Sequence, residues 1–406
     1  MRTFLRPLFS LYHYLWAFVS AVFFWFPSRR VRVIGVTGTK GKTTTVALLA
    51  HIFSEAGKRS AYLSSAYMSD GVSVSKNKTG NSMPGRFFIQ QFLHHAVRAK
   101  SSYAFIEVTS QGAVQHRHKF IQWAGAVFLD IHPEHIESHG SFEKYLHAKV
   151  SFFAYVQKHS PRAIFYIHKN DSYADKFIQA AQKSKKVLFG VEDLYDVPDV
   201  PALPGEFNKI NISAVYAIAR EEGISHDVIA RALQSFTGVS GRMEFVIREP
   251  FEVVVDYAHT PESVEAVYIF LQKRAHDRKG KLICVLGSAG GGRDTWKRPA
   301  MGKHAGTYSD EIILTNEDPW DEDPRGIIDA IYEGVKTGKQ YNENHVCIIM
   351  DRKEAITKAL SLAREKDVVV LTGKGSESWI HVANGKKISW SESETVREAM
   401  REISRN

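Results

Sequence analysis

Apolar and amphipathic segments alternate along the chain from residue 31 onward. Short runs rich in valine and isoleucine predict buried strands, and longer runs with apolar residues at helical spacing predict helices. In the first half of the chain, the predicted strands are 31–36, 103–108, 126–131 and 163–167. The predicted helices are 45–56, 87–99, 142–156 and 210–222. This alternation is typical of an α/β fold in which helices cover both faces of a parallel sheet.

A second α/β unit follows a loop at 197–205 that contains three prolines. Its predicted strands are 251–256, 281–286, 311–315, 346–350 and 368–371, again separated by helical patterns. We expect the boundary between the two units near residues 237–240. The predicted organisation is therefore a hydrophobic helix at 1–30, a first domain at 31–238 and a second domain at 239–406.

The N-terminal segment is strongly apolar. Residues 8–26 contain no Asp, Glu, Lys or Arg, and arginines stand before and after the run at Arg2, Arg6, Arg29 and Arg30. A run of this length can span a bilayer, and its aromatic residues gather near both ends, as in interfacial belts. Serine and histidine within the run dilute its apolarity and favour instead a helix that lies on the membrane or packs on the protein. Both alternatives stay open, and in the first the catalytic body would face the cytoplasm, attached to the inner face of the membrane.

The segment 33–45, V-I-G-V-T-G-T-K-G-K-T-T-T, joins the first predicted strand to a helix through a loop rich in glycine and threonine. This order forms an anion site, because backbone N–H groups and the positive end of the helix face the phosphates. Val36 stands where a strict phosphate-loop pattern has glycine, so the loop is a variant. We predict that ATP binds to the loop residues Gly38, Thr39, Lys40, Gly41, Lys42, Thr43 and Thr44.

Composition limits the remaining options. The net charge of +9 suggests anionic partners, but the basic residues are dispersed, so phosphate-bearing substrates or an anionic membrane explain the charge as well as nucleic acid does. We therefore expect no nucleic-acid partner. Cys284 and Cys347 are the only cysteines and lie far apart. This usage excludes a disulfide framework and fits a reducing cytoplasm.

Polar residues follow two of the predicted strands, at the sheet edge where open α/β folds place ligands. Glu107 ends one strand and is a natural Mg²⁺ ligand opposite a phosphate loop. The next strand is followed by a crowded set, Asp130, His132, Glu134, His135, Glu137 and His139. Their spacing matches no zinc pattern, so polar support of the site is favoured over metal coordination. Lys149, in the helix 142–156, has no sequence signal of its own and would pass for a surface lysine.

These motifs together resemble the Mur ligase family, the ATP-dependent amide ligases of peptidoglycan precursor synthesis. The resemblance covers the chain from about residue 31 to the C-terminus. It rests on G-T-K-G-K-T-T-T at 38–45, E-V-T-S-Q at 107–111, H-I-E-S-H-G-S-F-E-K-Y-L-H-A-K at 135–149, N-D-S at 170–172, L-P-G-E-F-N-K-I-N at 203–211, G-R-M-E at 241–244, D-Y-A-H-T-P at 256–261, G-S-A-G-G-G-R-D at 287–294 and G-K-G-S-E at 373–377. The set is most similar to the MurE-like branch, which adds the third residue to UDP-MurNAc-dipeptide.

The resemblance implies a fold, a reaction and a set of site residues. The fold would be a phosphate-loop ATPase domain followed by a smaller Rossmann-like domain. The substrates would be a muropeptide-like carboxylate and an amino acid, with ATP and Mg²⁺ as cofactors. Lys42, Glu107, His135 and Lys149 would be catalytic. The metal would be held by Thr43, Glu107 and a carbamylated Lys149, and the nucleotide would also meet Asn211, Arg242 and Asp256.

Several features depart from the family pattern. Few residues precede the phosphate-loop strand, so we expect no N-terminal UDP-binding domain and consider a lipid-linked acceptor. Gln111 replaces a histidine that helps to hold a second metal, which predicts weaker binding there. Trp320 replaces the arginine that pairs with the distal carboxylate of diaminopimelate, in the acidic cluster 317–323.

The predicted amino-acid contacts are Glu317, Asp318, Trp320, Gly373 and Glu377. Loss of the arginine among acidic neighbours favours a cationic or neutral side chain, and a lysine-like amine is the expected substrate. The competing interpretation is that the cluster is only a solvated acidic loop.

Three other functions remain open at this point: a folylpolyglutamate synthase-like ligase, a nucleotide-binding membrane adaptor without ligase activity, and a phosphate-loop kinase. The D-Y-A-H-T-P and G-R-M-E motifs disfavour the first, and the presence of Glu107 and Lys149 disfavours the second. A kinase would turn over ATP without any need for an amino acid.

Overall fold

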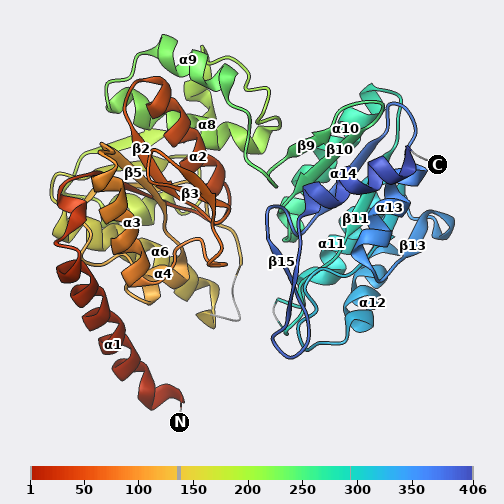
Figure 1. Ribbon diagram of the computed structural model, residues 1–406, viewed down its shortest axis with the longest axis horizontal. Coiled ribbons are helices and arrows are strands. Elements are labelled where there is room, and N and C mark those ends of the chain that lie inside the picture. The colour runs from red at the N-terminus through yellow and green to blue at the C-terminus, as the bar shows by residue number, and fades with distance from the viewer. Residues whose placement is uncertain (1, 135–138, 293, 405–406) are drawn as a thin grey trace. The chain divides into compact units, whose positions relative to one another are not determined.

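The computed structural model describes residues 2–134, 139–292 and 294–404, with the side chains of residues 2–8 left out. The chain divides into two compact units, unit 1 (residues 1–237) and unit 2 (residues 238–406). Each unit is a sheet with helices packed on it (Figure 1). The predicted α/β class is confirmed.

Unit 1 contains a sheet of eight strands in the part of the chain that is described. Their spatial order is β4 (Val74–Lys76), β3 (Tyr67–Ser69), β2 (Ser60–Leu63), β5 (Tyr103–Glu107), β1 (Arg32–Thr37), β6 (Trp123–Phe128), β7 (Ile164–His168) and β8 (Lys186–Phe189). The strands from β2 to β8 in this order are parallel, whereas β3 and β4 are antiparallel additions at one edge. The predicted parallel arrangement is therefore right, but the interior strand β2 and the strands β3, β4 and β8 were missed.

The helices of unit 1 pack on both faces of this sheet. They are α1 (Arg2–Phe23), α2 (Lys42–Glu55), α3 (Arg86–Arg98), α4 (Ser110–Val114), α6 (Phe142–His159), α7 (Ala174–Ala180), α8 (Glu206–Glu221) and α9 (His226–Ser235). Alternate strand residues form one core with α3, α6 and α7, because successive side chains of a strand point to opposite faces. Helix α2 packs instead with α8 and α9.

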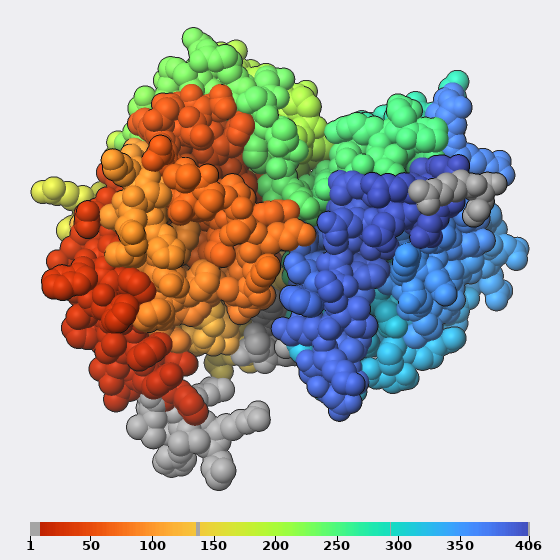
Figure 2. All heavy atoms as spheres, viewed as in Figure 1, coloured from red at the N-terminus to blue at the C-terminus, as the bar shows by residue number. Residues whose placement is uncertain are grey.

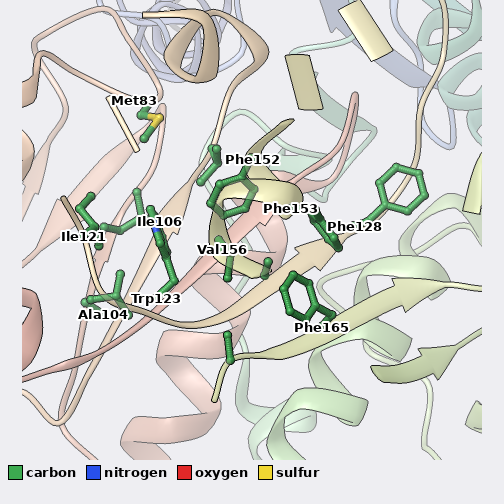
Figure 3. Packing of buried hydrophobic residues seen from close by; sticks show 14 of the residues in the cluster. Met83, Ala104, Ile106, Ile121, Trp123, Phe128, Phe152, Phe153, Val156 and Phe165 are labelled. Carbon is green, nitrogen blue, oxygen red and sulfur yellow. The ribbon is translucent and has the colours of Figure 1, made fainter. Parts of the chain in front are cut away.

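Aromatic rings fill the core between α6 and the sheet (Figure 3). Phe152 meets Trp123 edge-on with ring centroids 5.0 Å apart, and Phe153 lies 5.3 Å from Phe165. A Cβ atom on Gly35 of β1 would lie 2.6 Å from Phe152 and 2.8 Å from Trp123. Only glycine fits here, so this position lets α6 approach the strand that leads into the phosphate loop.

Strand β6 ends earlier than the sequence predicts. The expected strand 126–131 is replaced by Trp123–Phe128, and the chain leaves the sheet before Asp130. Leu129 and Ile131 are buried although they lie outside the strand, which explains the wrong boundary. Leaving the ladder frees the Asp130 side chain to face the loop after β1.

Unit 2 is built on a second sheet. Its spatial order is β13 (Val346–Ile348), β12 (Glu311–Leu314), β11 (Leu282–Leu286), β14 (Val368–Thr372), β10 (Glu252–Asp256) and β9 (Glu244–Ile247), with β9 antiparallel and the others parallel. A separate hairpin joins β15 (Trp379–His381) to β16 (Lys387–Ser389). The helices are α10 (Pro261–Asp277), α11 (Lys297–Tyr308), α12 (Pro324–Val335), α13 (Arg352–Leu362) and α14 (Glu392–Ile403).

The N-terminal apolar run forms most of α1, which packs against α3. Within the described ranges, no helix combines the length and the apolar character that crossing a membrane requires. This finding corrects the expectation that residues 8–26 could span a bilayer.

Candidate active site

The phosphate loop lies between β1 and α2, at the carboxyl edge of the unit 1 sheet. Gly41 precedes the first helical residue with φ 77° and ψ −16°, a left-handed conformation that favours glycine. Within the described ranges, no side chain caps this helix end. The first N–H groups of an α-helix have no intrahelical partner, so the N-terminus of α2 can donate to phosphate oxygens.

Asn211 of α8 packs against the phosphate loop at Gly41. A Cβ atom on Gly41 would lie 1.9 Å from Asn211 Oδ1, so this contact also requires glycine. Asn211 Nδ2 donates to Asn208 Oδ1 at 3.1 Å, which fixes the orientation of the amide. The structure thus places Asn211 against the phosphate loop, and its expected contact with adenine stays a prediction.

Two lysine side chains meet at one backbone oxygen of the loop. Lys42 Nζ donates to Gly38 O at 2.7 Å and to Thr39 O at 2.8 Å. Lys149 Nζ, from α6, donates to the same Gly38 O at 2.6 Å. Lys149 matches no local sequence signal for a site, but the structure brings it to the phosphate loop as the resemblance implied.

Lys149 is buried to 2% exposure. Burial and, to a lesser degree, the neighbouring Lys42 lower the pKa of its ammonium to about 7, against the weaker opposing effect of Glu134 and Asp130. Its ammonium also lies 4.8 Å from the centre of the Tyr145 ring. A large fraction of Lys149 is therefore a neutral amine near pH 7.

Thr43 and Glu107 converge beside the loop. Thr43 Oγ1 donates to Glu107 Oε1 at 2.8 Å, and Ser65 N donates to the same oxygen at 2.7 Å. Glu107 ends β5, whose register pairs it with Val36 of β1, so adjacent parallel strands deliver both groups to one edge. Ser65 was not predicted, because it follows β2 in a segment without a recognisable motif.

Asp130 shapes the loop rather than a metal centre. Its Oδ1 accepts from Thr39 N at 2.7 Å and from Lys40 N at 3.0 Å. Thr39 Oγ1 in turn accepts from His132 N at 2.9 Å and lies 3.0 Å from Tyr145 Oη. These bonds agree with the expected polar support.

The described ranges cover only some of the other residues in the polar cluster at 130–139. His135 and Glu137 lie outside the described residues, so the predicted role of His135 stays untested. His139 lies 3.1 Å from the Ser110 hydroxyl, and Gln111 is exposed. In the described ranges, no group of three or more His, Cys, Asp or Glu residues could by itself hold a metal.

The remaining predicted nucleotide residues lie in unit 2. Asp256, at the end of β10, accepts from Met243 N and Ala258 N, each at 2.7 Å. Burial raises the pKa of this carboxyl, and the nearby Arg242 opposes the shift. The Arg242 guanidinium lies 4.1 Å from the centre of the Tyr257 ring. Asp256 therefore fixes the backbone around Arg242, whatever it contacts in a complex.

The acidic cluster of unit 2 is built around a buried lysine. Lys374 has no exposed side-chain surface and donates to Asp318 Oδ1 at 2.8 Å and to Glu377 Oε2 at 2.6 Å. Burial opposes its charge, but Glu377 and Asp318 outweigh burial and raise the pKa of Lys374. Tyr257 Oη donates to the other oxygen of Glu377 at 3.1 Å.

Glu317 faces this network as its least satisfied member. It is 5% exposed, and its Oε2 has no hydrogen-bond partner among the described residues. Burial raises the pKa of Glu317, while Lys374 and Arg352 oppose the shift. A Cβ atom on Gly373 would lie 2.1 Å from this oxygen, so the glycine keeps space beside it. A buried carboxylate oxygen without a partner is a candidate acceptor for a substrate ammonium.

The alternative of a solvated acidic loop is wrong for Glu317 and Asp318, which are buried. The neighbouring acids also make local contacts. Glu322 is paired with Arg298 at 2.6 Å, and Asp323 caps α12. Asp321 accepts from Asn384 N. These three acids support the local structure, and their expected effect on the charge of the substrate stays a prediction.

Trp320 occupies the position of the expected arginine. It has a left-handed φ of 55°, and its indole stacks on His381 with centroids 4.1 Å apart and planes 12° from parallel. Its backbone N donates to His381 O at 3.2 Å. The stack joins the acidic cluster to the β15–β16 hairpin and presents no positive charge.

Comparisons with known proteins agree with this arrangement. The model of the Mur ligase middle domain matches residues 36–208, and that of the Mur ligase glutamate ligase domain matches residues 241–375. A UDP-N-acetylmuramoyl-L-alanyl-D-glutamate–2,6-diaminopimelate ligase of Aquifex aeolicus is 32% identical, over 93% of this chain and 79% of that protein.

Solved structures show the same likeness. The structure of another UDP-N-acetylmuramoyl-L-alanyl-D-glutamate–2,6-diaminopimelate ligase aligns with a TM-score of 0.61 at 27% identity, over 92% of this chain and 79% of the other. The bifunctional folylpolyglutamate synthase/dihydrofolate synthase of Yersinia pestis aligns with a TM-score of 0.68 at 18% identity, over 96% and 92% of the chains. At that identity, the second likeness shows a shared fold alone.

The lowered pKa of Lys149 predicts a pH-dependent stability in CO₂-free buffer. The unfolded chain binds this proton up to pH ~10.4, whereas the folded chain loses it near 7. Between these values the unfolded state holds more protons, so stability should rise with pH, by at most about 1.4 kcal/mol per unit for one group. Urea unfolding of the wild type and of Lys149→Met from pH 7 to 9 measures the difference in slope.

Lys176→Met provides the matched control, because Lys176 is an exposed lysine of α7 in the same unit. This substitution should leave the pH slope of the wild type unchanged. Equal slopes in wild type and Lys149→Met would contradict the assignment of a depressed pKa to Lys149.

Proposed function

The chain belongs to the Mur ligase family and is an ATP-dependent acid–amino-acid ligase, and on this premise we propose that it joins a muropeptide-like carboxylate to an amino acid. The observation that carries the proposal is the convergence of Lys42, Lys149 and the Thr43–Glu107 pair around the open N-terminus of α2. This arrangement suits the activation of a carboxylate by phosphoryl transfer.

The reaction follows from the poor electrophilicity of a carboxylate. A substrate carboxylate oxygen attacks the γ-phosphorus of ATP, the bond to the bridging oxygen breaks, and ADP leaves. The resulting acyl phosphate is attacked at its carbonyl carbon by a neutral amine, and phosphate departs as the amide forms. Lys42 and the α2 N-terminus would offset the negative charge on the transferring group.

A divalent cation fits beside the phosphate loop. Thr43 Oγ1 and Glu107 Oε1 are hard oxygen donors only 2.8 Å apart, and the Ser65 hydroxyl lies 2.9 Å from Thr43 Oγ1. Magnesium commonly takes one or two protein oxygens together with phosphate oxygens and water. We propose Thr43 and Glu107 as its ligands; bound Mg²⁺ would neutralise phosphate charge.

Three further residues are proposed for the nucleotide. Asn211 would act through the phosphate loop that it supports. Arg242 would reach the nucleotide from unit 2, with Asp256 fixing the backbone beside it. We propose that the enzyme acts in the cytoplasm, where ATP is available, and that unit 1 contacts the inner face of the membrane through residues 8–26.

Two of the alternative functions considered from the sequence are disfavoured by the comparisons and by the site. Folylpolyglutamate synthases share the fold at 18% identity or less, whereas the diaminopimelate ligase relative exceeds 30% over nearly the whole chain. An adaptor without catalysis would have no use for a buried lysine at the phosphate loop.

We propose that the amino acid binds at Glu317, Asp318, Gly373, Trp320 and Glu377. The Glu317 oxygen, which has no hydrogen-bond partner among the described residues, suits an ammonium group. Trp320 supplies an aromatic face in place of a guanidinium, so it cannot form the bidentate pair that a second carboxylate prefers. The favoured side chain is therefore lysine-like rather than diaminopimelate, although the Aquifex aeolicus relative is named for the latter.

Ligase activity is tested with the full chain, Mg-ATP, muropeptide-type acceptors and a panel of amino acids. Mass spectrometry should detect the condensed product together with equimolar ADP and phosphate. Lys42→Ala should lower the rate by about 10²-fold or more, since it removes a charge that acts on the transition state. Lys176→Ala should retain the wild-type rate. ATP turnover that is independent of amino acid would favour a kinase and contradict the ligase.

Carbamylation of Lys149 requires a neutral amine, and its burial beside Lys42 provides one. Incubation of the protein with ¹³C-bicarbonate near pH 8 should give one carbamate signal in NMR spectra. Lys149→Arg should lose both the signal and most of the activity, because a guanidinium keeps the charge but cannot form the carbamate. An active wild-type protein without the signal would rule out this modification.

Amino-acid preference is tested by phosphate release with lysine and diaminopimelate. The wild type should prefer lysine in kcat/KM, and Trp320→Arg should shift the ratio towards diaminopimelate by about tenfold or more, as expected for one new charge-assisted pair. Trp320→Phe keeps an aromatic stack on His381 and should not shift the ratio. Preference of the wild-type enzyme for diaminopimelate would refute the proposal.

A further inference from the structure

Helix α1 presents a broad apolar side that the rest of unit 1 leaves uncovered. The side of α1 that faces the rest of unit 1 carries small side chains, and Ala17, Ser20 and Ala21 are buried there. Its exposed side chains are large and apolar, namely Phe9 (58%), Leu11, Tyr12, Tyr14, Leu15, Trp16, Phe18, Val19, Val22 and Phe23 (64%), followed by Trp25 (87%). They make up about half of all large hydrophobic residues that are exposed in the described chain. A contiguous apolar surface of this kind marks an interaction site.

The helix is fixed to unit 1 and cannot be surrounded by lipid without detaching. Ser10 Oγ lies 2.7 Å from His116 Nε2, and the rings of Tyr14 and Phe18 meet Phe120 edge-on with centroids 5.0 and 5.2 Å away. Beyond the helix, Phe24 packs on Phe87 of α3 at 4.8 Å. Figure 2 shows this segment in red as an outer edge of unit 1.

The charged residues near α1 indicate which kind of partner binds its exposed apolar side. The first 54 residues contain no Asp or Glu, and arginines stand at both ends of the apolar run. Arg29 and Arg30, which follow α1 after residues 24–28, are exposed, and Lys119 lies over the Tyr14 ring at 4.9 Å. An apolar side rich in Trp, Tyr and Phe beside basic residues matches the boundary between acyl chains and anionic headgroups.

A second copy of the chain fits this surface less well. Two copies would bring the same arginines together, in a protein whose net charge is already +9. Like charges that face one another disfavour association. An anionic bilayer can contact both the apolar side of α1 and the basic residues at the two ends of the apolar run.

We propose that α1 docks unit 1 onto an anionic phospholipid bilayer, lying in the plane of the membrane with its outward side in the headgroup–acyl boundary. This inference names the lipid chemistry behind the location given in the proposed function, and it does not depend on ligase activity. The binding should weaken with salt, because exposed charges are screened.

The experiment is vesicle flotation of the full chain. Vesicles of phosphatidylcholine with about 30% phosphatidylglycerol should retain the protein, and pure phosphatidylcholine vesicles should retain at least tenfold less, as expected for several basic groups near anionic lipid. The double variant Leu15→Glu/Trp16→Glu should lose binding at least tenfold. Arg29→Glu/Arg30→Glu should lose the preference for anionic vesicles.

Leu188→Glu/Ile388→Glu is the matched control, since it places two charges on exposed apolar residues that do not belong to α1 and should bind like the wild type. Ligase assays with soluble substrates, run on every variant, separate failure of docking from failure of catalysis. Equal binding to neutral vesicles, or no binding at all, would overturn the proposal. A dimer in analytical ultracentrifugation that Leu15→Glu/Trp16→Glu dissolves would assign the surface to a second copy and overturn it too.

Discussion

One backbone oxygen organises the site in unit 1. Gly38 O accepts from both Lys42 and Lys149, which come from α2 and α6 on opposite faces of the sheet. Two ammonium groups at one carbonyl repel each other, and the repulsion adds to the cost of burying Lys149. The loop conformation, the position of α6 and the reactivity of Lys149 therefore depend on one another.

The surrounding structure makes this strained arrangement rigid. Asp130 accepts from two successive N–H groups of the loop, and Asn211 touches it at Gly41 from the other side. Gly35 lets Phe152 approach β1, which sets the depth at which α6 and its Lys149 lie. A loop that is held from several directions can aim its own N–H groups at a ligand without reorganising, which is the basis of electrostatic catalysis.

The site residues that could be predicted from the sequence are those whose positions depend on short segments of the chain. The phosphate loop is a strand, a glycine turn and a helix start within a dozen residues, and Glu107 follows because its strand neighbours β1. Ser65 and the loop-binding role of Asp130 depend on contacts between distant segments, so no spacing predicts them. The burial of Glu317 likewise depends on Lys374, which lies 57 positions away in the chain. Strands β2, β3, β4, β8 and β9 were missed because each has only three or four residues and carries a weak apolar pattern.

Each unit contains a buried lysine, and the pKa values of these two lysines are shifted in opposite directions. Burial and the neighbouring Lys42 lower the pKa of Lys149 to about 7. Its ammonium bonds to a backbone carbonyl and lies over an aromatic ring. Lys374 is even more buried, yet Asp318 and Glu377 bond to it directly and its pKa rises. Burial alone thus does not decide the charge of a lysine; the number of carboxylates in direct contact does. The first environment favours an amine that can react, whereas the second favours a fixed cation that holds acidic residues in place around a substrate.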